Sequence, residues 1–283
     1  MNPLEQVVLA IQSLAYAFRQ ILQVPLWVPW LALGALQLAV IGGLWWFAHP
    51  TISWLLAPAV RAMAGEDALH YPNLFRWLPE LYGRFDLVVG ALAGAVVTGQ
   101  STALFAAWFS GQPLRPGEGM RRGVSRAGAL ILANLPLTLL VLGLSSVFNG
   151  WLEHRQGPAL LIRVAPLVTL GMAVILQAFF LWVNPLLMLG GRSLVGALTA
   201  LPRAATRGVW TALTLAVAAT VPLLPIQMLA RGSDQIVARG SPELVGWLVI
   251  AQALIALATG FVLTGGATLA YQSLVGPALE DDA

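Results

Sequence analysis

Apolar stretches long enough to cross a lipid bilayer recur along this chain, and they constrain its fold more than any other feature. An α-helix needs about 20 predominantly apolar residues to span the hydrocarbon core. Charged residues make up 10% of the 283 residues, whereas soluble domains carry about 25%. We therefore predict an all-α, polytopic membrane protein with six transmembrane helices. The predicted spans are residues 26–48, 85–109, 127–148, 160–189, 209–229 and 244–271.

The segments outside these spans complete the predicted domain organisation. Residues 1–25 predict an amphipathic helix, which either lies in the membrane interface or packs against the bundle. Residues 26–271 form the predicted six-helix transmembrane domain, with a short extracytoplasmic helical cap at 49–84. Residues 272–283 form an acidic tail. The apolar residues of the first helix recur at helical spacing, at Val7, Ile11, Leu14, Phe18 and Ile21.

The distribution of arginine predicts the orientation in the membrane. The loop at 111–126 holds four Arg and the loop at 190–207 holds three. Short loops rich in basic residues stay on the cytoplasmic side. Six spans then place both termini in the cytoplasm and the cap outside.

Arginines four residues apart occur at the same place in both basic loops, which are either copies of a parallel internal repeat or two generic basic hairpins. Residues four apart share a helix face. Each pair precedes a span, where the helix dipole disfavours cations. The pairs are either plain topology determinants or, by hypothesis, sites for lipid headgroups whose phosphates compensate the charge. The candidate lipid-binding residues are Arg122, Arg126, Arg203 and Arg207.

Polar amides inside the predicted spans form a second group of candidate residues. Each needs a hydrogen-bond partner in hydrocarbon. They either hold helices together or line a polar path for a solute. No Asp, Glu, Lys or His lies at the centre of a predicted span, which argues against a proton-driven transporter. The intramembrane candidates are Gln100, Asn134, Gln177 and Asn184.

Familiar catalytic and cofactor-binding patterns are missing from the sequence. There is no Cys, and the three His lie outside the predicted spans, so thiol chemistry and haem ligation within the membrane are not expected. A metal or acid–base site in the cap, formed by His70 with nearby acids, fits no ligand spacing. A net charge of +3 gives no reason to expect nucleic acid as a partner. We expect no enzyme activity, no cofactor and no metal site.

The segment at 184–210, NPLLMLGGRSLVGALTALPRAATRGVW, resembles a large group of six-span inner-membrane proteins of bacteria. This group includes the membrane domain fused to some glycerophosphodiester phosphodiesterases and many uncharacterised relatives. The resemblance covers about residues 85–270. It implies a six-helix bundle with elbow helices on the cytoplasmic side of the inner membrane. It implies no catalysis, because the phosphodiesterase domain lies outside the matching segment.

The sequence therefore predicts a multi-pass integral membrane protein without catalytic chemistry. We expect an accessory or scaffold component that organises membrane lipids or other membrane protein subunits. One alternative is a transporter or channel-like protein for a small solute, which would use the intramembrane amides. The other is a lipid-modifying membrane enzyme, which would use the acids and His of the cap.

Overall fold

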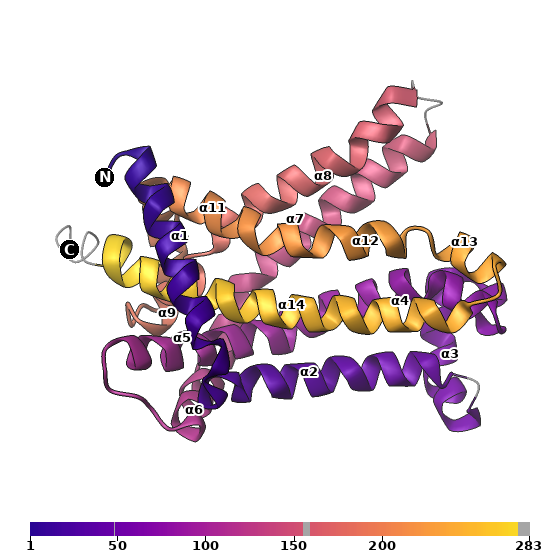
Figure 1. Ribbon diagram of the computed structural model, residues 1–283, viewed down its shortest axis with the longest axis horizontal. Helices are drawn as coiled ribbons and strands as arrows, with labels where there is room; N and C mark the ends of the chain where they lie inside the picture. The colour runs from indigo at the N-terminus through magenta and orange to yellow at the C-terminus, as the bar shows by residue number, and fades with distance from the viewer. Residues whose placement is uncertain (48, 155–158, 277–283) are drawn as a thin grey trace. The chain divides into compact units, whose positions relative to one another are not determined.

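The computed structural model describes residues 1–47, 49–154 and 159–276, and in this part of the chain every regular element is helical. Six helical segments are long and apolar enough to cross a membrane, which confirms the prediction of an all-α, polytopic protein (Figure 1). Residues 277–283, which include most of the predicted acidic tail, lie outside the described residues. The six candidate spans are Val24–Trp45, Asn73–Phe109, Ala127–Leu144, Val168–Met188, Val209–Ala230 and Pro242–Val275.

Fourteen α-helices run through the described residues, several of them joined end to end within one candidate span. In chain order they are α1 (Pro3–Arg19), α2 (Val24–Trp45), α3 (Pro50–Ala64), α4 (Asn73–Val89), α5 (Ala95–Phe109), α6 (Pro116–Ser125), α7 (Ala127–His154), α8 (Ala159–Phe180), α9 (Val183–Met188), α10 (Leu194–Arg207), α11 (Val209–Thr220), α12 (Leu224–Ala230), α13 (Ser233–Ala238) and α14 (Pro242–Ala270). A π-helical turn at Gly90–Gly94 joins α4 to α5, and another at Tyr271–Val275 follows α14.

The helices divide into two compact units. Unit 1 comprises Met1–Pro29, Ala95–Thr220 and Phe261–Ala283, and unit 2 comprises Trp30–Gly94 and Val221–Gly260. The predicted transmembrane domain at 26–271 is thus shared between the two units. Each unit has its own cluster of buried apolar side chains.

In unit 1, α1 packs through small residues and leaves its large apolar side chains exposed. Ala10, Ser13 and Ala17 are fully buried on one face, whereas Ile11 and Phe18 on the other face are more than half exposed. Small residues allow the close approach that helices need inside a membrane, where apolar side chains are equally well solvated by lipid. The helix therefore packs on the bundle through one face, and the other face leaves apolar side chains such as Ile11 and Phe18 exposed.

Each basic loop of unit 1 contains an elbow helix, α6 between α5 and α7 and α10 between α9 and α11. The turn before α6 has Gly111 at φ 74°, and the turn before α10 has Gly191 at φ 60°, a left-handed conformation that glycine adopts without strain. The Ser193 side chain accepts a hydrogen bond from the Gly196 N–H and so caps α10. α6 is held close to α5 and α10 packs on α9, and Figure 1 shows α7 beside α8.

In unit 2, the predicted cap does not end at Arg84. α4 starts at Asn73 and continues beyond Arg84 through the π-helical turn into α5, so that one helical segment covers Asn73–Phe109. Because the first part of this segment contains polar residues, the sequence did not indicate that it continues into the apolar span. Its buried apolar face joins α2, α3, α13 and α14 in the unit 2 core, where Leu78, Leu81 and Tyr82 are almost fully buried.

Candidate functional site

A pocket beside the first elbow helix contains one of the predicted lipid-binding arginines. Its volume is about 280 Å3, and it lies in unit 1 among α5, α6, α9 and the π-helical turn after α14. Arg122 of α6 lines it with Gln112, from the turn before α6, and Gln272, from the π-helical turn. Met188 and several alanines of α5 form its apolar wall, and none of the residues lining it is acidic. We call this site the elbow pocket.

The folding of α6 onto α5 explains how Arg122 reaches this pocket. A Cβ atom on Gly119 would lie 2.5 Å from the Leu104 side chain, and one on Gly123 would lie 2.2 Å from Gln100 Cγ. Only glycine permits such an approach, because real Cβ atoms do not come this close to other atoms. The buried glycine face of α6 therefore turns Arg122, which is exposed, towards the rim formed by α5 and α9.

The four predicted lipid-binding arginines have different environments. Arg126 is partly buried, and its guanidinium donates to the Leu187 carbonyl at the end of α9. Such a bond satisfies an otherwise unpaired carbonyl at a helix terminus. Arg203 is exposed on α10, whereas Arg207 is half-buried and its backbone carbonyl accepts from the Gln6 side chain at 3.0 Å. Arg122 is the only one of the four among the residues lining the elbow pocket.

Three of the four predicted intramembrane amides bond to neighbouring helices. Asn134 Nδ2 donates to Asn184 Oδ1 at 2.9 Å, which joins α7 to α9, and also to the Leu130 carbonyl at 2.8 Å. Gln100 Nε2 donates to the Met120 carbonyl of α6 at 3.4 Å. Gln177 lies partly buried on α8. The structure thus brings Asn134 and Asn184 together and leaves Gln100 at a separate contact, an arrangement that holds helices together.

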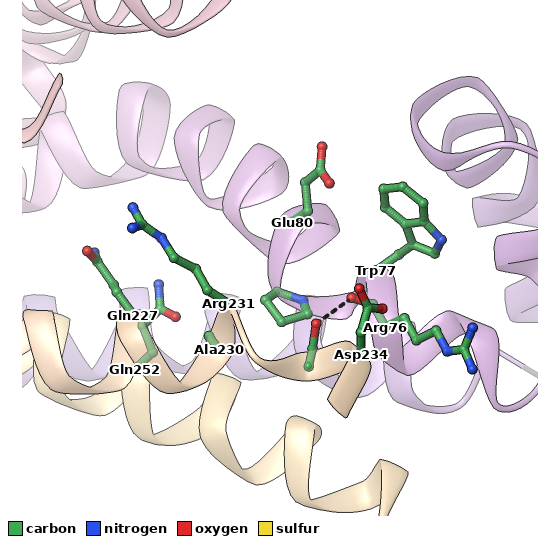
Figure 2. Close-up of a pocket in the computed structure, with 10 residues that line it drawn as sticks. Arg76, Trp77, Glu80, Gln227, Ala230, Arg231, Asp234 and Gln252 are labelled. Carbon is green, nitrogen blue, oxygen red and sulfur yellow. Dashed lines mark hydrogen bonds between the residues drawn. The ribbon is translucent and has the colours of Figure 1, made fainter. Parts of the chain in front are cut away.

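A second pocket, of about 450 Å3, lies in unit 2 and is strongly polar (Figure 2). Figure 2 shows the side chains of Arg231, Gln227 and Gln252 on one side of it and those of Asp234 and Trp77 on the other. The dashed line in Figure 2 is the bond from the Ser233 hydroxyl to the Arg76 carbonyl, at 2.9 Å, which ties α13 to α4. The pocket offers both signs of charge and two amides, which suits a polar solute or headgroup that carries both charges.

Sequence reasoning missed the unit 2 pocket, although a signal was present. Gln227, Arg231 and Asp234 are four and three residues apart, so on a continuous helix they would share a face at the end of an otherwise apolar span. This stretch looked like the start of an ordinary loop. Glu80, which also lines the pocket, forms an ion pair with Arg84 one turn along α4.

A carboxylate also lies inside unit 2. Asp86 of α4 accepts a hydrogen bond from Gln37 Nε2 of α2 at 2.7 Å. The sequence predicted only that no acid lies at the centre of a span, and because the predicted span began at residue 85, Asp86 was placed at its edge. The helical segment begins at Asn73, and Asp86 lies well within it.

The polar residues of the predicted cap are engaged in pairs. Arg61 forms an ion pair with Glu66, and the Arg61 guanidinium lowers the pKa of the Glu66 carboxyl below its usual range. The Tyr71 hydroxyl donates to Glu243 at 3.1 Å, and this hydrogen bond raises the pKa of Tyr71. Within the described residues, no group of three or more His, Cys, Asp or Glu is placed to hold a metal ion.

No family model, curated protein or solved structure matches this chain. Its function is therefore argued from the geometry of the two units.

Proposed function

We propose that this multi-pass membrane protein is a non-catalytic accessory component that organises anionic lipids and membrane partners. We place it in the bacterial inner membrane with both termini in the cytoplasm. The observation that carries the proposal is the elbow pocket, in which Arg122 and two glutamine amides surround a cavity lined by no acid.

The chemistry of the elbow pocket suits the phosphate of a lipid headgroup. The Arg122 guanidinium supplies a permanent positive charge and several N–H donors. The amide groups of Gln112 and Gln272 supply further donors from two other parts of the chain. Met188 and Leu189 form an apolar wall, against which the first carbons of acyl chains pack. A soluble anion would use only the polar half of this pocket, so a lipid fits it better.

The interior of unit 1 supports a scaffold. Asn134 and Asn184 satisfy each other, and Gln100 bonds to the backbone of α6. These amides stabilise contacts between neighbouring helices. The resemblance of residues 184–210 to six-span proteins of bacterial inner membranes supports the same proposal.

A second candidate function, passage of a small polar solute, is favoured by the polar pocket of unit 2. Gln252 lines that pocket and belongs to the candidate span Pro242–Val275, so the pocket reaches an intramembrane position. A lipid-modifying activity has less support, because the cap acids Glu66 and Glu80 are held in ion pairs with arginines.

Lipid retention tests the proposed function. We expect Arg122→Glu to lower the retention of phosphatidylglycerol and cardiolipin on the purified protein by at least about fivefold, because each basic residue near an anionic surface contributes about 1 kcal/mol. Arg121→Glu is the matched control: Arg121 is the neighbouring exposed residue on α6 and does not line the elbow pocket. Lipids that stay bound are quantified by mass spectrometry.

Equal losses in the two variants would show a general effect of surface charge and contradict the pocket. Unchanged retention in Arg122→Glu would also contradict it. Solute release from liposomes that contain the same proteins distinguishes transport from lipid organisation. Transport is favoured if Gln252→Leu abolishes the release of trapped solutes and Arg122→Glu leaves it unchanged.

A further inference from the structure

The hydrogen bond between Gln37 and Asp86 holds a partly buried carboxylate between α2 and α4 of unit 2. Gln37 lies near the middle of α2, about 20 Å from the first residue of that helix and about 12 Å from its last, at 1.5 Å per residue. α2 has the length of a single membrane crossing. Since Asp86 lies 2.7 Å from the Gln37 amide, it lies at the same depth as the middle of this span.

The amide that bonds to Asp86 has an unused acceptor. Gln37 is 6% exposed, and its Oε1 atom is buried without a hydrogen-bond partner. Buried polar atoms normally have partners, and an exception calls for an explanation. Tyr82, which is 1% exposed, lies one helical turn before Asp86 on the same face of α4, and its buried hydroxyl has no hydrogen-bond partner. Three oxygen-bearing side chains therefore lie close together, with Gln37 and Tyr82 buried and Asp86 partly buried.

Charge compensation for Asp86 is lacking in the elements around it. α2 contains no titratable residue. Arg61 of α3 is paired with Glu66, and Arg84 of α4 is paired with Glu80. The other charged groups on these elements are Asp67 before α4, Arg76 on α4, Asp234 on α13 and Glu243 on α14, and no ion pair in the described residues includes Asp86.

Because the Gln37 amide has both a donor and an unused acceptor, Gln37 and Asp86 can form a hydrogen bond whether Asp86 is ionised or protonated. With Asp86 ionised, the carboxylate accepts from Gln37 Nε2, as in the structure. With Asp86 protonated, rotation of the amide about its last side-chain bond would present Oε1 as acceptor for the new O–H. One proton is taken up from water and returned to it, and no other bond changes. A metal cation fits less well, because Na⁺ or Ca²⁺ needs about six oxygen ligands.

We propose that Asp86, with Gln37 as its partner, forms a proton-binding site within the membrane-spanning part of unit 2. This inference goes beyond the lipid-organising role and does not depend on it. An ionisable group inside a span is costly and is usually functional. The site would make the protein sensitive to pH through unit 2, whereas the elbow pocket belongs to unit 1.

Carbodiimide labelling tests the site in the full-length protein. Dicyclohexylcarbodiimide is apolar and modifies protonated carboxyl groups in apolar surroundings. We expect it to modify Asp86 in liposomes and to label at least about tenfold less at high pH than at low pH, as a single carboxyl group loses its proton. The modified residue is identified by peptide mass mapping. Asp86→Asn removes the label, and Glu118, which is exposed on α6, stays unlabelled as an internal control.

A second variant keeps the proposal testable where Asp86→Asn fails to fold. Gln37→Met has a similar volume and lacks the N–H that stabilises the ionised carboxylate, so the midpoint of labelling should move to higher pH. Labelling that is independent of pH, or absent, would overturn proton exchange. Protection by Na⁺ but not by K⁺ at constant pH would also overturn it and would indicate a cation site.

Discussion

Polar side chains within the spans of unit 1 are used to join helices, and the Asn134–Asn184 pair is the clearest case. The sequence identified both residues as intramembrane amides, because each interrupts an apolar run. It did not predict that they bond to each other, since helical spacing gives the face of one helix and not the neighbour that the face meets. Arg126 illustrates the same point, because its bond to the Leu187 carbonyl depends on a helix 61 positions away.

A double-mutant cycle measures the Asn134–Asn184 contact. We expect Asn134→Leu and Asn184→Leu each to destabilise the protein, and the double variant to lose less than the sum of the two. The coupling should be about 0.6–1.7 kcal/mol, the range found for hydrogen bonds between membrane helices. Unfolding in mixed detergent micelles gives the free energies.

The control for this cycle is Gln177→Leu, on α8. No bond described in the structure involves the Gln177 side chain, so combining this substitution with Asn134→Leu should give additive losses. Additive losses for Asn134 and Asn184 themselves would mean that the bond between them contributes no stability.

At the scale of single elements, the elbow helices were predicted well and the helix joints were not. The resemblance of residues 184–210 implied elbow helices, and each of the loops 111–126 and 190–207 contains one after a turn at a glycine. The π-helical turn that carries α4 into α5 was not predicted, because an inserted residue changes the helical phase without changing the residue types. The cap was therefore given an end at Arg84 that the helix does not have.

Close packing of α6 on α5 yields a prediction with a control in the same helix. We expect Gly123→Ala to destabilise unit 1 by about 1–3 kcal/mol, the usual cost of overpacking. The added Cβ would lie 2.2 Å from Gln100 Cγ and 3.1 Å from the backbone nitrogen of Gln100, which is not free to move. Thermal unfolding in detergent measures the loss.

Gly117→Ala provides the comparison, because a Cβ atom at Gly117 meets nothing within 4 Å. Alanine favours a helix over glycine by about 1 kcal/mol, so this variant should be neutral or slightly more stable. Equal destabilisation by the two substitutions would show that α6 does not depend on close contact with α5.

For the whole molecule, composition and apolar runs were enough to predict the all-α class and the number of candidate spans, and they were not enough to predict the functional site. Long apolar runs with few charges leave a bilayer as the one suitable solvent, and six candidate spans are present. The division into two units follows from contacts between residues such as Leu44 and Val245, which are far apart in sequence. The elbow pocket likewise joins three separate segments, of which only the one with Arg122 carried a sequence signal.

The orientation in the membrane is the last prediction, and the sequence makes it unusually accessible to experiment. The chain has no Cys, so each single-cysteine variant reports on one position without further changes. Gly117→Cys on α6 and Thr199→Cys on α10 are exposed positions in the two basic loops. The positive-inside rule predicts that both react with a membrane-impermeant maleimide only in inverted vesicles.

Asp67→Cys, at an exposed position before α4, should react only in right-side-out vesicles. The prediction has the chain cross the membrane twice between the two elbows, once through α7 and once through α8. Labelling of the two elbows from opposite sides of the membrane would contradict it. Reaction of both elbows from outside would keep the two crossings and reverse the orientation. In that case Arg122 would face the outer leaflet, and the lipid proposed for the elbow pocket would have to come from there.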